Sequence, residues 1–227
     1  MISAKQISKS YETPGETVEV LKDLKLELAD GEAAAITGPS GCGKTTLLNL
    51  LGALDRPTSG SITIGDHDIA SFSEDQATHF RNHSLGFVFQ QHYLLPQLTV
   101  LENVLVPRLA GDWQESESDT RDRARDLLAK VGLDHRLTHL PWQLSGGEKL
   151  RTAVARALVN QPKLVLADEP TGSLDPASTD TIADLLLELN RDEKVTLLVV
   201  THNQALAQRI GRTLQLRDGK LWSAVAE

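Results

Sequence analysis

The sequence predicts an α/β fold in which a parallel sheet forms the core, an antiparallel β layer lies at one edge and an α-helical subdomain is inserted. Three patterns support this fold class. The apolar runs at 32–38, 163–170 and 194–202 are near-continuous, as in buried parallel strands. Residues 18–28 instead alternate between apolar and charged types, which is typical of antiparallel strands. Residues 118–133 carry leucines at helical spacing, with charges on the opposite face.

Turn signals and apolar periodicity place the other elements in chain order. The expected elements are strands within 1–30, a turn at Asp30-Gly31, a strand at 32–38, a helix at 44–54, a strand within 56–69, the helix at 118–133, a strand at 163–170, a helix at 176–193, a strand at 194–202 and a hairpin at 212–225 turning at Asp218-Gly219. The stretches around the 118–133 helix, from about 71 to 143, are expected to be loops. We expect one domain over 1–227, with an α/β core and antiparallel layer at 1–89 and 153–227 and a helical subdomain at 90–152.

Composition limits the classes of function. The formal net charge is −8 and the pI is near 5.4, whereas a nucleic-acid-binding face is basic, so we expect no nucleic-acid partner. No apolar run reaches the roughly 20 residues of a membrane-spanning helix, and the N-terminal segment lacks the apolar stretch of a signal peptide. The single cysteine, Cys42, excludes an internal disulfide and suits a reducing compartment. We therefore expect a cytosolic chain.

The segment GPSGCGKTT matches the phosphate-binding pattern G-x-x-x-x-G-K-[ST] between a predicted strand and a predicted helix. Its glycines let the backbone turn N–H groups toward phosphate oxygens, and the helix N-terminus adds a partial positive charge. Lys44 can reach the β- and γ-phosphates, and Thr45 can ligate Mg²⁺. The core is therefore expected to be a P-loop NTPase (RecA-like) core. Its nucleotide-binding residues would be Gly38, Pro39, Ser40, Gly41, Cys42, Gly43, Lys44, Thr45 and Thr46.

Two carboxylates end the strand at 163–170. Asp168 and Glu169 lie at the carboxyl end of a parallel sheet, where ligands bind in such folds. Asp168 suits Mg²⁺, directly or through water, and Glu169 can polarise an attacking water as a general base. Two acids at a strand end are on their own more often a solvated loop, but the phosphate loop favours the catalytic interpretation.

A second anion site is expected at the start of another helix. The motif LSGGE consists of Leu144, Ser145, Gly146, Gly147 and Glu148. Small residues and free N–H groups at a helix start favour a bound anion. A capped helix start without a ligand is the alternative.

Together these motifs resemble the nucleotide-binding subunits of ATP-binding cassette (ABC) transporters, over essentially the whole chain. The family's signature is LSGGQ, and LSGGE is a variant of it. Gln90 resembles the Q-loop glutamine, His202 the switch histidine, and Tyr11 the aromatic residue that stacks on adenine. Asn203 departs from the aspartate usual after that histidine. The residues that resemble the D-loop are Ser173, Leu174 and Asp175.

The resemblance implies an ATP hydrolase that forms an ATP-dependent homodimer, with ATP and Mg²⁺ as cofactors. ATP on the phosphate loop of one subunit would be closed over by the signature helix of the other, and loss of the γ-phosphate would open the dimer. The implied catalytic residues are Glu169, His202, Gln90 and Lys44. The implied Mg²⁺ ligands are Thr45, Gln90 and Asp168.

Some of these assignments have structural alternatives. Tyr11 could simply pack at a sheet edge, Gln90 could be a solvated loop amide, and His202 could be a satisfied core histidine. Cys42 has no evident catalytic role, but a bulky adduct on its thiol would block ATP.

The resemblance also implies a separate integral membrane permease. The chain would then be a peripheral subunit on the cytoplasmic side of the inner or plasma membrane, in contact with the membrane only through the permease. Tyr93, Leu94, Leu95 and Leu98 lie near the segment where the family docks its membrane subunit, with internal packing as the alternative for each. The stretches LGFVFQQHYLLPQLTVLENV and LVLADEPTGSLD most resemble the lipoprotein-release and macrolide-export group.

Two other functions are open at this point. A soluble ABC ATPase could serve a cofactor-assembly or cell-division complex without transport. A non-enzymatic interaction module is the other, but the intact Glu169 and His202 argue against it. The transported substrate is not encoded here, because its choice belongs to the permease.

Overall fold

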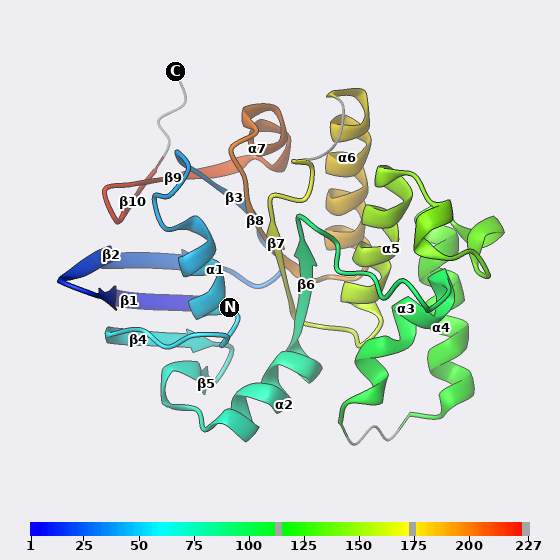
Figure 1. Cartoon of the computed structure of the whole chain (residues 1–227), viewed down its shortest axis with the longest axis horizontal. Coiled ribbons are helices and arrows are strands. Elements are labelled where there is room, and N and C mark those ends of the chain that lie inside the picture. Colours follow the sequence, from blue (N-terminus) through cyan, green and yellow to red (C-terminus); the bar gives the residue numbers. More distant parts are fainter. Residues whose placement is uncertain (112–114, 173–175, 224–227) are drawn as a thin grey trace.

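Two β-sheets and the helices packed on them form the protein (Figure 1). The computed structural model describes residues 1–111, 115–172 and 176–223. In this part of the chain the central sheet has the strand order β10-β9-β3-β8-β7-β6, and the second sheet has the order β2-β1-β4-β5. The predicted α/β class, with an antiparallel layer and a helical insertion, is confirmed.

The central sheet is the predicted parallel sheet. Neighbouring strands from β9 through β3, β8 and β7 to β6 pair in parallel, and β10 forms a hairpin with β9. The hairpin turns at Asp218 and Gly219, whose φ angles of 52° and 77° suit a two-residue turn. The strands are β3 (Ala33–Thr37), β6 (Leu85–Phe89), β7 (Leu164–Asp168), β8 (Thr196–Val200), β9 (Arg212–Arg217) and β10 (Lys220–Ser223).

The second sheet is the predicted antiparallel layer. β1 pairs with β2, with Ile2 opposite Leu28, and β4 pairs with the other side of β1. Alternate residues of β2, such as Leu24 and Leu26, are buried, because successive side chains point to opposite faces of a strand. The strands are β1 (Ile2–Thr13), β2 (Glu16–Leu28), β4 (Ser59–Ile64) and β5 (His67–Asp68).

Two hydrophobic cores lie on opposite faces of the central sheet. Along β8, Leu197 and Val199 belong to one core, and Leu198 and Val200 belong to the other. The second core also contains the leucines of α1 (Lys44–Leu51) and the buried face of the antiparallel layer. Helix α1 is thus enclosed between the two sheets (Figure 1), which fixes its first turn next to the carboxyl ends of the parallel strands.

The other face of the central sheet carries most of the remaining helices. α3 (Val100–Leu105), α4 (Glu117–Lys130) and α5 (Gly146–Leu158) pack on one another and form the helical region, drawn green in Figure 1. α5 also packs on β6, and α6 (Pro176–Asp192) packs on α7 (Gln204–Ile210). The predicted subdomain limit between residues 152 and 153 falls inside α5, and the limit itself stays a prediction. The short 3-10 helices are η1 (Ile69–Ser71), η2 (Val106–Leu109), η3 (Asp134–Arg136) and η4 (Pro141–Gln143).

The stretch from 71 to 143 is more regular than the sequence interpretation, which expected loops around a single helix. It also contains α2 (Glu74–Ser84), β6 and α3. α2 has no apolar stripe that would reveal it, since its buried residues are Ala77 and Phe80. Its start is marked by a capping box between Ser73 and Gln76, a local signal that is visible in the sequence. The expectation of loops was therefore wrong for these segments.

The helices are short compared with a bilayer. α6, at 17 residues, spans roughly 25 Å at 1.5 Å per residue. In the part of the chain that the structure describes, no helix is both long and apolar enough to cross a membrane.

Candidate functional site

The candidate site lies where β3, β7 and β8 end, beside the loop that joins β3 to α1. A cavity of about 690 Å³ opens there. It brings phosphate-loop residues together with residues that follow β6, β7 and β8, as expected at the carboxyl edge of a parallel sheet. The lining residues are Val20, Ser40, Gly41, Gly43, Lys44, Thr45, Thr46, Gln90, Glu169 and His202.

The loop between β3 and α1 requires glycine at both of its ends. A Cβ at Gly38 would lie 2.4 Å from the carbonyl oxygen of Leu216, and a Cβ at Gly43 would lie 2.8 Å from Cγ1 of Val20. Gly43 also has a φ of 103°, in the left-handed region. Among the described residues no side chain caps the first turn of α1, whereas side chains cap α2, α3, α4, α5 and α7. The first turn of α1 is therefore suited to bind an anion.

Lys44 is buried and faces the same cavity. Its Nζ donates to the carbonyl oxygens of Gly38 and Pro39, at 2.9 and 3.0 Å, and lies 3.9 Å from Oε1 of Glu169. The loop thus holds the ammonium group at the point where phosphates would bind.

Thr45 and Asp168 form an oxygen pair suited to a hard cation. The Thr45 hydroxyl donates to Oδ2 of Asp168 at 3.2 Å, and Oδ1 of Asp168 is buried without a hydrogen-bond partner among the described residues. Burial raises the pKa of Asp168 above its ordinary value, while the Thr45 hydrogen bond opposes this rise and the Glu169 charge adds to it. An orphaned carboxylate oxygen beside a hydroxyl fits Mg²⁺. Thr45 and Gln90 line the cavity and Asp168 contacts Thr45, so the three predicted ligands lie at this cavity or beside it, and their role as ligands stays a prediction.

Glu169 and His202 form the second pair of the cavity. Oε2 of Glu169 accepts the Thr201 hydroxyl at 3.1 Å and the His202 backbone N–H at 3.0 Å, and it lies 2.8 Å from Nδ1 of His202. The Glu169 backbone has a φ of 47°, an uncommon conformation that is found often at functional sites. The His202 side chain is 65% exposed, so it is not a core histidine. The Thr201 hydroxyl, the His202 N–H and the His202 ring thus surround Oε2, while Oε1 faces the Lys44 ammonium.

Tyr11 lies on β1 and does not line the cavity. Its hydroxyl donates to Oδ2 of Asp55 at 2.9 Å, and the Lys9 ammonium lies 4.8 Å from the centre of its ring. The side chain is 37% exposed. A role in stacking on adenine therefore stays a prediction.

The structure does not bring the second predicted anion site to the first. Ser145 caps α5, and it forms a capping box with Glu148. Ser145 and Gly146 are exposed and Leu144 is buried, but no residue of this motif lines the phosphate-loop cavity. The predicted D-loop residues Ser173, Leu174 and Asp175 lie outside the described residues.

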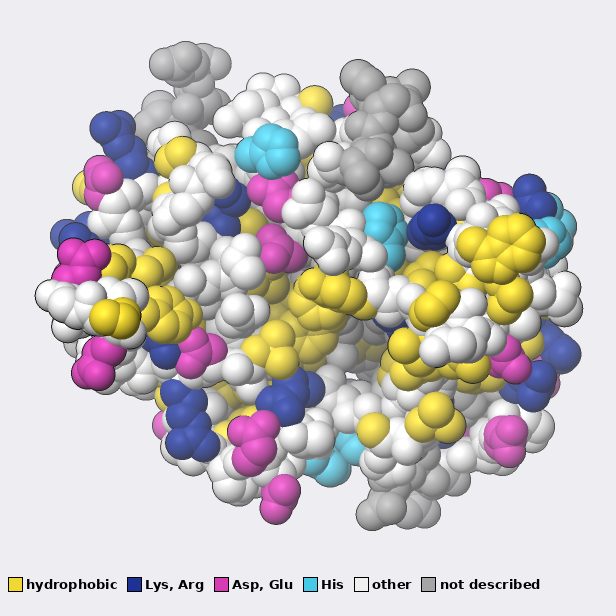
Figure 2. All heavy atoms as spheres, viewed as in Figure 1, with side chains coloured by type: hydrophobic (Ala, Val, Ile, Leu, Met, Phe, Trp, Pro, Cys, Tyr) yellow, Lys and Arg dark blue, Asp and Glu magenta, His cyan; other side chains and the backbone are white. Residues whose placement is uncertain are grey.

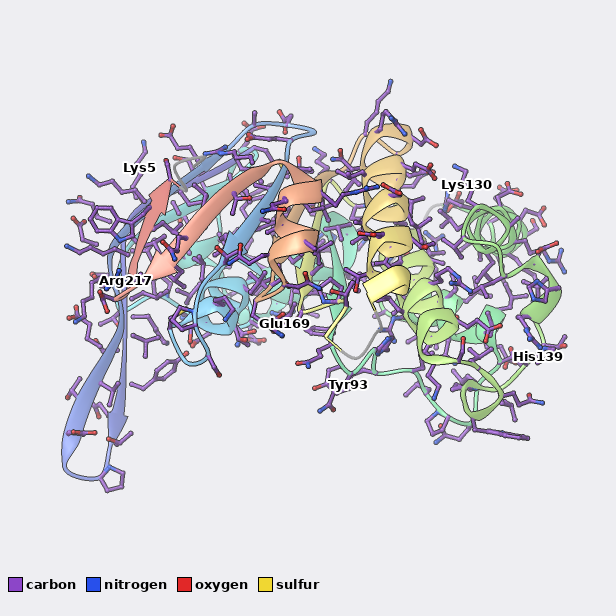
Figure 3. All side chains as sticks on the ribbon, turned by 90° about the horizontal axis from the view of Figure 1, so that it is seen from above. Lys5, Tyr93, Lys130, His139, Glu169 and Arg217 are labelled. Carbon is purple, nitrogen blue, oxygen red and sulfur yellow. The ribbon has the colours of Figure 1, made fainter. Side chains whose placement is uncertain are left out.

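The four predicted docking residues divide into two groups. Tyr93 and Leu95 are exposed, at 59% and 43%, whereas Leu94 and Leu98 are partly buried. Tyr93 lines an open groove of about 450 Å³ whose walls are mainly apolar. Apolar side chains gather around the hollow in the middle of this face in Figure 2. Tyr93 and Glu169 lie along the same side of the molecule in Figure 3.

Arg156 of α5 fixes the segment that carries Tyr93. Its guanidinium donates to the carbonyl oxygens of His92 and Tyr93, at 2.5 and 2.7 Å, and burial lowers its pKa. His92 and Tyr93 have φ angles of 60° and 45°, both in the left-handed region. No local pattern in the sequence links residues so far apart, so this contact was not predicted. Thr201 was not predicted either, although its place directly before His202 was an available signal.

Comparison with known proteins places these features in a family. The sequence model of the ABC transporter family matches residues 21–172. The lipoprotein-releasing system ATP-binding protein LolD 1 of Rhodopirellula baltica is 50% identical over 221 residues, covering 97% of this chain and 96% of that protein. The LolD protein of Geobacter metallireducens is 49% identical over 221 residues, covering 97% of each chain.

Two solved structures are similar over the full length of both chains. The dimeric structure of a bacterial ABC transporter cassette has a TM-score of 0.89 at 39% identity and covers 100% of each chain. A dimeric post-hydrolysis state of the same cassette, bound to ADP and Pi, has a TM-score of 0.89 at 38% identity.

Proposed function

Since this chain belongs to the ABC transporter family, we propose that it is the ATP-hydrolysing subunit of a transporter that releases lipoproteins. The observation that carries the ATPase assignment is the cavity that Lys44, Thr45, Glu169 and His202 line, with Asp168 accepting the Thr45 hydroxyl. The choice of lipoprotein release rests on the names of its relatives.

ATP would bind with its phosphates against the loop between β3 and α1. The first turn of α1 supplies N–H donors, and Lys44 exchanges its two loop carbonyls for phosphate oxygens. Thr45, Asp168 and Gln90 would hold Mg²⁺. When bound, this ion supplies positive charge that neutralises the phosphates and polarises the γ-phosphoryl group.

Glu169 would act as the general base. Its Oε2 is held by Thr201 and His202. Its Oε1 faces Lys44, and once Lys44 binds phosphate oxygens, Oε1 can accept a proton from the attacking water. With the proton on Nδ1, His202 donates to Oε2, and its other ring nitrogen is free to contact the γ-phosphate. One pair of residues thus orients the water and senses the phosphate.

A second copy would complete each site. No signature residue lines the cavity of its own chain, so the start of α5 must reach a nucleotide on another chain. Two chains that face each other head to tail place each phosphate loop opposite the partner's α5, as a two-fold axis allows. The dimeric state of the two similar structures supports this arrangement.

The membrane partner would be a separate permease that docks on the groove beside Tyr93. The groove is mainly apolar, and its lining residues come mainly from α2, β6, η2 and α5, with Tyr93 beside them. A peripheral subunit on the cytoplasmic face could pass the closure of its dimer to a permease docked there. In this way ATP hydrolysis would power release of the cargo.

The test is an affinity purification from detergent-solubilised native membranes with tagged Glu169→Gln protein and ATP. We expect this variant to bind ATP, to persist as a closed dimer and to retain an integral membrane protein. Glu188→Gln, on the exposed face of α6, is the matched control, and it should hydrolyse ATP as the wild type does. Recovery of soluble partners alone would overturn the transporter assignment, and wild-type turnover in Glu169→Gln would overturn the role of Glu169.

A further inference from the structure

The start of α5 carries a negative charge at the place where a phosphate should bind. Glu148 closes the signature motif, and its Oε2 accepts both the backbone N–H and the hydroxyl of Ser145, each at 2.8 Å. The hydrogen bonds from Ser145 and the ion pair with Arg136 lower the pKa of Glu148 to about 2, so the group is anionic at neutral pH. The family's usual glutamine would be neutral at this position.

This charge would weaken phosphate binding in the proposed composite site. The inference below rests on that proposed site. In that site the Ser145 hydroxyl and the N–H groups of the first turn of α5 would face the γ-phosphate bound to a second copy. The Glu148 carboxylate is one hydrogen bond away from the same hydroxyl. Two anions so close repel each other, and the carboxylate also competes with the phosphate for the hydroxyl proton.

Arg136 is built into the structure as the counter-charge. It ends the short helix η3, and its Nε donates to Oε1 of Glu148 at 3.0 Å. Its Nη1 lies 3.0 Å from Nε2 of His139, which holds the guanidinium plane in place. Both partners of the ion pair are partly buried, with 34% of the Arg136 side chain and 13% of the Glu148 side chain exposed. Solvent therefore screens this pair less than a surface pair.

The turn that carries Arg136 is itself anchored. The backbone N–H groups of Val100 and Leu101, in the first turn of α3, donate to the carbonyl oxygens of His139 and Leu137. Figure 3 shows His139 on the same side of the molecule as Tyr93 and Glu169. The guanidinium therefore has a fixed position relative to the start of α5, and it does not depend on a flexible surface loop.

We propose that Arg136 is a positioning residue of the composite ATP site: it holds Glu148 in the capping box and cancels its charge, so that the start of α5 can accept the γ-phosphate of a nucleotide bound to a second copy. Arg136 touches neither nucleotide nor water in this assignment. Its effect passes through Glu148, so it should vanish when residue 148 is neutral.

The test uses the Glu169→Gln background and measures the ATP concentration that gives half-maximal dimer formation in size-exclusion chromatography. We expect Arg136→Ala to raise this concentration at least tenfold. Adding Glu148→Gln to Arg136→Ala should restore it to within about twofold of the parent, because a neutral amide needs no counter-ion. Arg136→Lys, which keeps the charge, should stay within about threefold of the parent.

Arg125→Ala is the matched control. It removes one positive charge from the exposed face of α4, where Arg125 pairs with Asp122 of the same helix, and it should leave dimer formation unchanged. A structural role would make Arg136→Ala and its double variant with Glu148→Gln equally weak, and this would overturn the proposal. Equal loss in Arg136→Lys and Arg136→Ala, or no loss in Arg136→Ala, would also overturn it. If Arg136→Ala does not fold, the lysine variant and the double variant carry the test.

Failure of the proposed function would be distinguishable from failure of this inference. A Glu169→Gln parent that stays monomeric at every ATP concentration would contradict the composite dimer itself. A parent that dimerises, with no difference among the residue 136 variants, would contradict the role of Arg136 alone.

Discussion

Two helix starts in this protein are rich in glycine, and they are built in opposite ways. α1 follows a loop in which Gly43 is required by the chain itself, through its positive φ and the closeness of Val20. α5 begins at a side-chain capping box, and a Cβ on Gly147 would find Nη1 of Arg151 at 3.6 Å, an ordinary contact distance. α1 lacks such a cap among the described residues.

The difference shows that glycines in similar sequence patterns can be required for different physical reasons. The glycines before α1 shape the backbone around the proposed phosphate site of their own chain. The described residues give no steric reason for glycine at Gly147, so we infer that the reason lies outside the chain. A nucleotide on a second copy would approach this surface, and a side chain there would keep it away. The two helix starts thus differ as the proposal requires, with α1 serving a site within its own chain and α5 serving half of a site shared with a second copy.

The largest expected effect comes from mixing a variant of each helix start. Lys44→Ala and Ser145→Asp should each reduce ATP hydrolysis by about 100-fold or more, because each removes or repels phosphate in both sites. An equimolar mixture should recover about a quarter of wild-type activity, since half of the pairs are mixed and each mixed pair keeps one intact site. The measurement is steady-state phosphate release after co-incubation with ATP.

The control is an equimolar mixture of the Lys44→Ala protein and the Glu169→Gln protein. Both substitutions affect the half of the site that contains the phosphate loop, so no mixed pair contains an intact site and no activity should return. Recovery in that mixture, or no recovery with Ser145→Asp, would contradict the division of the site between two chains.

The second largest effect is on the free energy of unfolding, which should differ between alanine variants at the two helix starts. Gly43→Ala should lower the free energy of unfolding by about 1–3 kcal/mol, because alanine is strained at a φ of 103° and its Cβ meets Val20. Gly147→Ala should leave the free energy of unfolding unchanged or raise it by up to about 1 kcal/mol, since alanine favours helix. Both variants should lose ATP hydrolysis. Urea unfolding followed by circular dichroism measures the first quantity, and equal destabilisation by both variants would remove the distinction.

Local patterns predicted most of the α1 site. The glycine loop, Lys44, Thr45 and the two acids at the end of β7 lie next to strong strand and helix signals, so their closeness follows from the parallel sheet. Local patterns could not predict the contacts that depend on tertiary packing, such as Arg136 with Glu148 or Arg156 with the His92–Tyr93 backbone. A charged residue in a polar stretch gives no sign of which distant partner it will reach.

The fold shows the same limit. β3, β7 and β8 were predicted because every residue of a strand buried on both faces is apolar or nearly so. α2 was missed because it buries two residues and is marked mainly by its cap, which apolar periodicity does not detect. β6 is apolar and largely buried like the predicted strands, but its five residues follow that polar helix without a turn signal to mark a new element.

The smallest effect compares the acidic residues beside the two helix starts, whose pKa values shift in opposite directions. The pKa of Glu148 is lowered from 4.5 to about 2 in the folded protein. Its carboxylate therefore contributes its full stabilisation when the pH is above the pKa of the unfolded chain, and this stabilisation is lost as the pH falls toward 2. Asp168 has a raised pKa because it is buried, so its charge lowers stability above its unfolded value, and this cost disappears in acid.

Replacing each acid by its neutral amide should therefore change the free energy of unfolding in opposite directions. Glu148→Gln should lower the free energy of unfolding at pH 7 by about 1 kcal/mol, and this loss should shrink at pH 3, where the wild-type carboxylate begins to protonate. Asp168→Asn should raise the free energy of unfolding at pH 7 and have less effect at pH 3, because the wild-type carboxyl is then already neutral. Urea unfolding at pH 7, 5 and 3 without nucleotide or Mg²⁺ measures both differences. If Glu148→Gln did not lower the free energy of unfolding at pH 7 more than at pH 3, the charge at the start of α5 would not be held by its capping box and Arg136. The start of α5, which stabilises the charge of Glu148, would then no longer differ from the start of α1, where the charge of Asp168 needs a cation.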